Sequence, residues 1–339
     1  MFKIGTEKAR DLFSQLSRSY KIIAPVIEKG MGRFSHSDLC IYRQVRSFEE
    51  IEFFGKTYYS PKEIFFPVRK ALFDFQSDGV KQAEISAVPM IIFLRACDIN
   101  AVSVLDYHFL EKDGYEDIYY KVMRQRFKFV LLECKQPFDN CFCVSLGTNK
   151  TENYSVFMRK VDDGYEVQVQ DRDLENYFSS GESRDVEPEF VQENFCSISL
   201  PEEIDTSIFK SKIWKEYSLR CTACGRCNLC CPTCTCFTVQ DIASEDDLQE
   251  EINDFGQRQR IWSSCQVKNF SLLAGGHDFR TLKGDRMRYK VLHKIRDFKK
   301  KAGFSMCVGC GRCEDVCPEY ISMFKCIEKI NNAVYQGAK

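Results

Sequence analysis

The chain has 339 residues, 44% of them apolar, with 48 basic and 49 acidic side chains and a net charge of −1. This length suffices for two domains, and the balanced charge argues against a protein built to bind nucleic acid or a membrane surface. No apolar stretch approaches the roughly eighteen residues that a transmembrane helix needs. Because the start of the chain does not resemble an export signal, we expect a cytoplasmic protein whose 19 cysteines are reduced.

The first 200 residues carry patterns of both helices and strands. Apolar residues at helical spacing predict a helix over residues 7–17, with one face formed by Ala9, Leu12, Phe13 and Leu16. A second helix is predicted over residues 98–110, with Asp98 as its N-cap. Apolar runs predict strands over residues 22–27, 63–68, 88–94 and 127–133. We therefore expect an α/β domain with a mixed sheet over residues 1–200, ending in the polar stretch 181–201.

Residues 201–339 contain two cysteine runs with the same spacing. The first run consists of Cys221, Cys224, Cys227 and Cys231, and the second of Cys307, Cys310, Cys313 and Cys317; proline follows each. Both read C-x2-C-x2-C-x3-C-P, the pattern of bacterial ferredoxins in which the fourth cysteine of each run ligates the other cluster. The sequence predicts an α-helical ferredoxin-type domain with two [4Fe–4S] clusters, one on Cys221, Cys224, Cys227 and Cys317, the other on Cys307, Cys310, Cys313 and Cys231.

Structural zinc and disulfides are the alternative uses of such cysteines. Zinc sites take their ligands from two separated pairs, and disulfides need an oxidising compartment, so both fit this pattern less well. Cys230 lies beside Cys231 and makes the last ligand of the first run ambiguous by one residue. The spacing and the following Pro232 favour Cys231 as the ligand. Clusters and thiolates oxidise readily, which suggests an anaerobic way of life.

The segment between the two runs is longer than in a minimal ferredoxin, and we expect a helical insertion there. It holds an acidic stretch over residues 245–251 and a basic one over residues 286–301. The basic stretch has apolar residues at helical spacing: Met287, Val291, Ile295 and Phe298. It is either an amphipathic helix with a solvated basic face or a docking face for a subunit that exchanges electrons.

Four further cysteines lie near the ends of predicted strands in the first domain. Cys97 and Cys134 follow two of these strands, while Cys141 and Cys143 would point to one face of an extended chain. If the two strands are neighbours, the four thiols converge at one edge of the sheet. They can then hold a third [4Fe–4S] cluster; the alternative is that they are small core residues, as free cysteines often are.

A weaker candidate set consists of Cys234, Cys236 and Cys265, which either ligate a further cluster with another group or pack around the first one. His277 follows a glycine pair and is either a structural residue or a ligand or proton carrier. The remaining cysteines, Cys40, Cys196 and Cys326, look incidental. A glycine-rich dinucleotide fingerprint after a strand is missing from the sequence, so we expect no nicotinamide site in this chain.

Several stretches form a set when they are taken in chain order: Arg95-Ala-Cys97-Asp98, Asp139-Asn-Cys141-Phe-Cys143-Val-Ser, Gly147-Thr-Asn-Lys150, Cys231-Pro-Thr-Cys234-Thr-Cys236, Trp262-Ser-Ser-Cys265, Ala274-Gly-Gly-His277 and the second cysteine run. This set closely resembles the iron–sulfur electron-transfer subunit of the anaerobic sulfite reductase, from about Gly32 to the C-terminus. The layout is also similar to the iron–sulfur β subunit of soluble sulfhydrogenases, which is the second possibility.

The resemblance to the sulfite reductase family implies a cytoplasmic complex of three subunits. A flavin- and nicotinamide-binding subunit supplies electrons, the iron–sulfur subunit passes them on singly, and a sirohaem-containing catalytic subunit reduces sulfite to sulfide. This chain would then belong to an oxidoreductase without carrying catalytic residues itself. Two alternatives stay open: the iron–sulfur subunit of a soluble hydrogenase, and an iron–sulfur redox sensor that catalyses no reaction.

Overall fold

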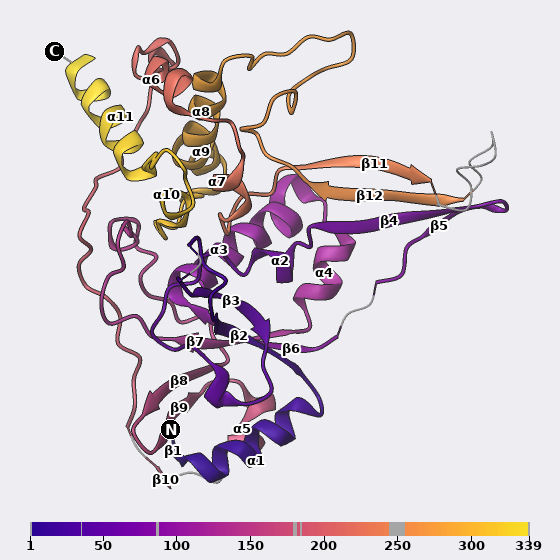
Figure 1. The fold of residues 1–339 in the computed structure, drawn as a ribbon, viewed down its shortest axis with the longest axis vertical. Helices are drawn as coiled ribbons and strands as arrows, with labels where there is room; N and C mark the ends of the chain where they lie inside the picture. Colours follow the sequence, from indigo (N-terminus) through magenta and orange to yellow (C-terminus); the bar gives the residue numbers. More distant parts are fainter. Residues whose placement is uncertain are drawn as a thin grey trace.

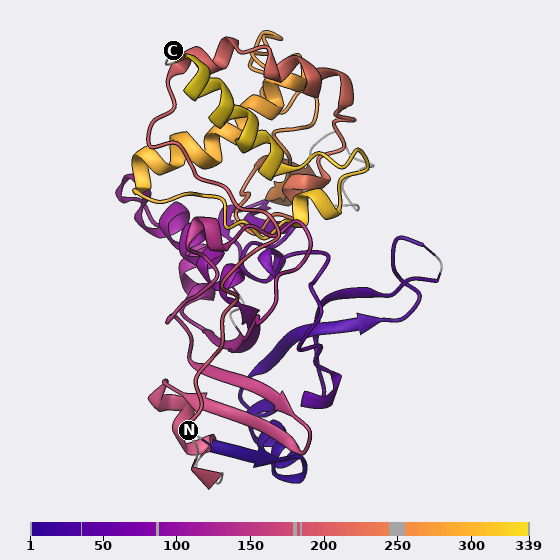
Figure 2. The ribbon, with the colours of Figure 1, turned by 90° about the vertical axis from the view of Figure 1, so that its left-hand side faces the viewer.

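A computed structural model describes residues 2–34, 36–85, 88–178, 182–183, 185–243 and 255–337. An α/β part with a mixed sheet is followed by a mostly helical C-terminal part, which confirms the predicted fold class. Figure 1 shows the C-terminal helices at one end of the molecule and the N-terminal helix and strands at the other, and Figure 2 shows the same arrangement from the side. The predicted acidic stretch over residues 245–251 lies outside the described residues.

The main sheet has eight strands in the order β10-β1-β9-β8-β7-β6-β2-β3. In chain order they are β1 (Phe2–Gly5), β2 (Lys21–Glu28), β3 (Leu39–Gln44), β6 (Met90–Arg95), β7 (Phe127–Leu132), β8 (Val156–Val161), β9 (Gly164–Val169) and β10 (Glu182–Ser183). Strands β2, β6, β7 and β8 pair in parallel. The apolar runs of β6 and β7 are buried, as parallel strands covered on both faces require. The strands predicted over residues 22–27, 88–94 and 127–133 are therefore confirmed.

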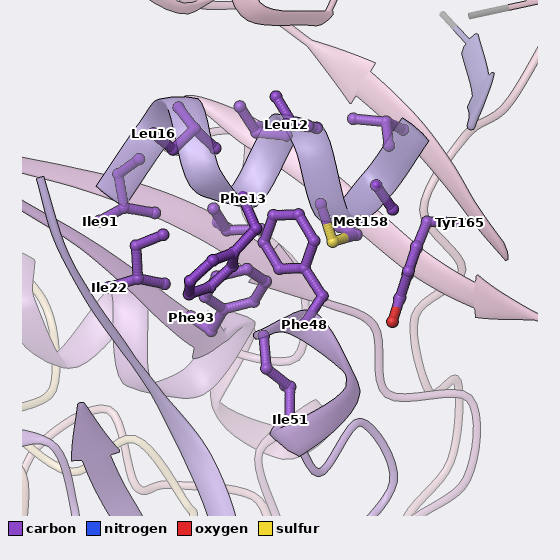
Figure 3. Packing of buried hydrophobic residues seen from close by; sticks show 14 of the residues in the cluster. Leu12, Phe13, Leu16, Ile22, Phe48, Ile51, Ile91, Phe93, Met158 and Tyr165 are labelled. Atoms are coloured by element: carbon purple, nitrogen blue, oxygen red, sulfur yellow. The ribbon is translucent and has the colours of Figure 1, made fainter. Parts of the chain in front are cut away.

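One face of this sheet is covered by α1 (Thr6–Ser17) and α5 (Arg172–Phe178). Figure 3 shows Leu12, Phe13 and Leu16 of α1 among Ile22, Ile91 and Phe93 of the strands. The rings of Phe13 and Phe48 meet edge to face with centroids 5.0 Å apart. Because the predicted apolar face of α1 is the buried one, this helix could be predicted from its spacing alone.

The opposite face carries α2 (Lys62–Phe65), α3 (Ala96–Asp106) and α4 (Ile118–Arg124). The strand predicted over residues 63–68 is wrong: the chain forms the short helix α2, and Pro67 cannot donate a ladder hydrogen bond. The predicted capping role of Asp98 is also wrong. Arg95 is the N-cap of α3, and the Asp98 carboxylate lies inside the first turn, where it binds Arg312.

A second sheet of four antiparallel strands projects from the side of the molecule (Figure 1). Its order is β11-β12-β4-β5, formed by β4 (Arg69–Gln76), β5 (Gly79–Gln82), β11 (Phe237–Ala243) and β12 (Gly256–Trp262). The expectation that the insertion between the cysteine runs is helical is thus wrong for its first part. Strand β12 pairs with β4, so this sheet joins segments from both sides of the predicted boundary near residue 200.

The C-terminal helices form their own core. They are α6 (Ile213–Arg220), α7 (Arg226–Leu229), α8 (Lys283–Leu292), α9 (Phe298–Ala302), α10 (Arg312–Asp315) and α11 (Met323–Gly337), with a π-helical turn over His293–Asp297 between α8 and α9. Trp214, Met287 and Phe324 belong to their shared apolar cluster. Among the described residues, none of the helices has the length and apolar character that a membrane span requires.

The basic stretch over residues 286–301 is helical, as predicted, but its basic face is not solvated throughout. Arg286, Lys290 and Lys294 follow one another at four-residue spacing, and only 6%, 4% and 3% of their surfaces are exposed. Lys290 and Lys294 lie next to the apolar stripe through Met287 and Val291, which faces the core. Both of these lysines therefore point towards the interior, where the cysteine runs lie.

Candidate metal centres

The first cysteine set lines a single cavity. Cys221 and Cys224 come from the loop that joins α6 to α7, Cys227 comes from α7 itself, and Cys317 comes from the loop after α10. The fourth cysteine of the second run thus reaches the first three cysteines of the other run, as the ferredoxin pattern requires. The loop turns through positive φ at Ala223 and Gly225, and the Ala223 N–H donates to the Cys221 sulfur at 3.3 Å. A backbone donor directed at sulfur suits a thiolate ligand.

In the second set, Cys231 lies near Cys307, Cys310 and Cys313, and Cys313 also lines the cavity of the first set. Burial raises the pKa of Cys307 and takes that of Cys310 to about 12, and in both cases the nearby Cys231 adds to the rise. A hydrogen bond from the Cys234 thiol lowers the pKa of Cys231 well below its usual value. The Lys294 ammonium lies 3.4 Å from the Cys231 sulfur and favours its thiolate form.

Cys230, the competing last ligand of the first run, has different surroundings. Its side chain is fully buried, and its thiol donates weakly to the Cys227 carbonyl, with 3.8 Å between sulfur and oxygen. Burial raises its pKa well above the usual value. Lys294 hydrogen-bonds to Cys231, whereas Lys290 acts on Cys230 only through its charge; Cys231 as the last ligand of the first run stays a prediction.

Three buried lysines surround these sets. Lys294 donates to Thr233 at 2.8 Å, and Lys62 donates to the carbonyls of Asn228 and Cys234 at 2.9 and 3.0 Å. Burial would lower the pKa of Lys290, but the thiols of Cys227, Cys313 and Cys234 outweigh it and raise that pKa. Among the described residues, these ammonium groups contact carbonyls, a hydroxyl, sulfur and, for Lys62, the face of the Trp262 ring.

Buried cations are costly unless negative charge lies nearby. Four thiolates on a [4Fe–4S] cluster supply such charge, so Lys290 and Lys294 fit a chain that holds anionic clusters. The sequence interpretation missed these lysines because it assigned the whole basic stretch to a solvated or docking face. The sequence did hold a signal for their burial: Lys290 and Lys294 lie beside the apolar stripe of a helix that is placed between the two cysteine runs.

The four cysteines of the third set also line a single cavity: Cys97, Cys134, Cys141 and Cys143. Strands β6 and β7 are parallel neighbours, so the residues that follow them meet at one edge of the sheet, as predicted. The extended conformation expected for residues 141–143 is wrong, since Cys143 has helical φ and ψ of −64° and −32°. Burial raises the pKa of all four thiols, to about 11 for Cys143.

In the weaker set, Cys236 and Cys265 contact each other, whereas Cys234 contacts Cys231. The Asn228 amide donates to the sulfurs of Cys265 at 3.1 Å and Cys236 at 3.6 Å. A hydrogen bond from Cys236 lowers the pKa of Cys265 to about 6, whereas Cys234 pairs with Cys231. A further cluster on Cys234, Cys236 and Cys265 stays a prediction.

The remaining candidates have local roles in the structure. His277 is exposed and its ring packs edge-on against Phe279, with centroids 4.4 Å apart. Buried Cys326 donates to the Tyr217 hydroxyl at 3.1 Å. Within the described ranges, no three histidine, cysteine or acidic side chains are close enough together to hold a single metal ion. A four-iron cluster instead receives its thiolates at the separate corners of a cube.

Comparisons with known proteins agree with the cysteine spacing. Residues 220–321 match the family described as a 4Fe-4S dicluster domain. The chain is also similar to sulfhydrogenase 2 subunit beta of Pyrococcus furiosus, with 28% identity over 353 residues that cover 98% of each protein. These findings support iron–sulfur clusters in a subunit of an oxidoreductase. Between the two resemblances seen in the sequence, they favour the sulfhydrogenase β subunit over the sulfite reductase.

Proposed function

We propose that this chain is the iron–sulfur electron-transfer subunit of a soluble oxidoreductase complex of the sulfhydrogenase type. One observation carries the proposal: Cys317 of the second run lines the same cavity as Cys221, Cys224 and Cys227 of the first. Thiolate-bound [4Fe–4S] clusters accept and release single electrons. In this chain the two runs hold the clusters crosswise, and Lys290 and Lys294 balance their negative charge inside the fold.

The proposed complex places the other chemistry in partner subunits. A flavin- and nicotinamide-binding subunit exchanges electrons with this chain on one side, and a catalytic subunit does so on the other. Full-length similarity to a protein named as a sulfhydrogenase subunit supports this division of labour. The reduced thiols that such clusters need support a cytoplasmic location.

A second candidate is the corresponding subunit of an anaerobic sulfite reductase, whose catalytic partner contains sirohaem. The stretch Asp139-Asn-Cys141-Phe-Cys143-Val-Ser with Gly147-Thr-Asn-Lys150 favours it, because this combination is narrower than the ferredoxin runs. It differs from the first candidate in the final electron acceptor and not in the role of this chain.

The test uses the complex purified without oxygen. We expect hydrogen to bleach the iron–sulfur absorption of the complex, and NAD(P)H to yield hydrogen in the reverse direction. Replacing Cys224 by serine should abolish hydrogen formation from NAD(P)H, whereas Cys196→Ser, outside the candidate ligand sets, should leave this activity near wild type. Sulfite-dependent oxidation of NAD(P)H without any response to hydrogen would move the assignment to the second candidate. A chain that contains zinc and no iron would overturn the electron-transfer role.

A further inference from the structure

A cavity in the α/β part of the chain gathers thiols from separate segments. Cys97 lies in the first turn of α3, which follows β6 directly; Cys134 follows β7, and Cys141 and Cys143 belong to the next loop. Cys141 and Cys143 are 7% exposed each, and their neighbour Phe142 packs on the core of the C-terminal helices. The four sulfurs thus lie around an interior space that several chain segments close together.

Basic side chains complete the wall of this cavity. Arg95, Lys56 and Arg312 all line it. Arg95 is 6% exposed, and its guanidinium donates to three carbonyls, those of Glu133, Phe53 and Gly55, at 2.8, 3.0 and 2.9 Å. Lys56 and Arg312 have carboxylate partners, Asp315 and Asp98, at 2.6 Å. For Arg95 the described residues supply only neutral partners.

An uncompensated buried guanidinium is unfavourable, so a structure that keeps one needs negative charge close to it. Neutral cysteines used only for packing would not provide this charge. Four thiolates bound to an iron–sulfur cluster would provide it at the place where Arg95 lines the wall.

The cavity directly adjoins the second cysteine run. Cys310 lines it as well, and the Cys141 thiol donates to the Cys310 carbonyl with 3.4 Å between sulfur and oxygen. The Phe142 N–H donates to the Gly309 carbonyl at 2.8 Å. The loop that carries two of the four thiols is therefore bonded to the loop that carries the second set.

We propose that Cys97, Cys134, Cys141 and Cys143 hold a third [4Fe–4S] cluster, separate from the two ferredoxin-type sets and next to the second. The inference deepens the proposed electron-transfer function and rests on it. It extends the metal sites beyond residues 220–321, to which the dicluster family match is confined. Arg95 is the residue that balances the charge of this centre.

The test is the amount of iron and acid-labile sulfide per full-length chain purified anaerobically, combined with EPR of the reduced protein. We expect about twelve irons, four for each of three clusters. The double variant Cys97→Ala/Cys134→Ala should contain about eight and lose one EPR signal. The matched control Cys40→Ala/Cys196→Ala removes two half-buried thiols outside the cavity and should keep about twelve.

The wild-type value can overturn the third centre even if a variant fails to fold, and the loss of about four irons in the double variant assigns that centre to this cavity and not to Cys234, Cys236 and Cys265. About eight irons in the wild-type chain would overturn the third centre while leaving the proposed function intact. The same holds if the double cavity variant keeps its full iron content and EPR spectrum. A wild-type chain without iron would instead overturn the proposed function itself.

Discussion

Arg226 and Arg312 occupy equivalent positions in the two cysteine runs, but their surroundings differ. Each follows a glycine and precedes the third cysteine of its run. Arg226 is exposed, whereas Arg312 is 2% exposed and donates to both oxygens of the fully buried Asp98 carboxylate at 2.6 and 2.8 Å. Arg312 also donates to the carbonyl and hydroxyl of Thr57 at 3.0 and 2.8 Å. One arginine of the repeat thus joins the second run to the α/β part.

Replacing Arg312 by glutamine leaves the Asp98 carboxylate buried without its cation. Removal of one partner of a buried ion pair costs about 3–5 kcal/mol, so we expect a clear fall in the apparent melting temperature of the anaerobic protein. The double variant Arg312→Gln/Asp98→Asn removes both charges and should recover most of the loss. The exposed control, Arg226→Gln, should change stability by less than about 0.5 kcal/mol. Equal melting temperatures for Arg312→Gln and Arg226→Gln would contradict this account.

At the scale of elements, the loop before α10 packs backbone against backbone on the loop that contains Cys141 and Cys143. A Cβ atom on Gly309 would lie 2.7 Å from the backbone of Phe142 and Cys143, and one on Gly311 would lie 2.5 Å from the Asn140 carbonyl oxygen. Both glycines also have positive φ, of 62° and 72°. Both positions therefore favour glycine for two reasons: the backbone has positive φ, and a Cβ atom would clash with the neighbouring loop.

Gly303 is a control for the first reason alone, because it has positive φ but no close neighbour. Its φ is 82°, and no atom lies within 4 Å of the position that its Cβ would occupy. Gly303→Ala therefore changes only the backbone preference, which costs about 1–2 kcal/mol. Gly309→Ala adds a steric conflict of typically about 1–3 kcal/mol and should also reduce the iron content, because it separates the two loops. Melting temperature and iron analysis of both variants provide the comparison; the same losses in both would show that the close approach does not matter.

The elements also show what could be predicted from the sequence. Strands β6 and β7 are apolar except for Arg95 and Lys128, so both strands could be predicted from the sequence. The convergence of Cys97 and Cys134 needed only the parallel pairing of these strands. The ferredoxin spacing is local and could be read in the same way. Strand β12, Gly-Gln-Arg-Gln-Arg-Ile-Trp, is mostly polar and is defined by its pairing with the distant β4, so no local pattern indicated it. The role of Lys294 likewise depends on a sulfur 63 residues away.

For the molecule as a whole, contacts across the predicted boundary connect the two parts at several places. Strand β12 pairs with β4, Arg312 binds Asp98, and the Lys62 ammonium donates to carbonyls of Asn228 and Cys234. Lys62 also lies 4.1 Å from the centre of the Trp262 ring, a cation–π contact. The division into domains 1–200 and 201–339 remains a proposal, and these contacts imply that such domains would not behave independently.

A cut between the proposed domains tests this implication. Glu202 and Glu203 are both exposed, so a protease recognition sequence inserted between them should be accessible. After cleavage under anaerobic, non-denaturing conditions, we expect the two fragments to elute together in size-exclusion chromatography and to keep their iron, because the β4–β12 pairing and the buried Arg312–Asp98 pair do not depend on the connection. The uncut insertion variant is the control for the insertion itself. Fragments that separate in buffer would show that the connecting chain, and not the packing between the parts, holds the molecule together.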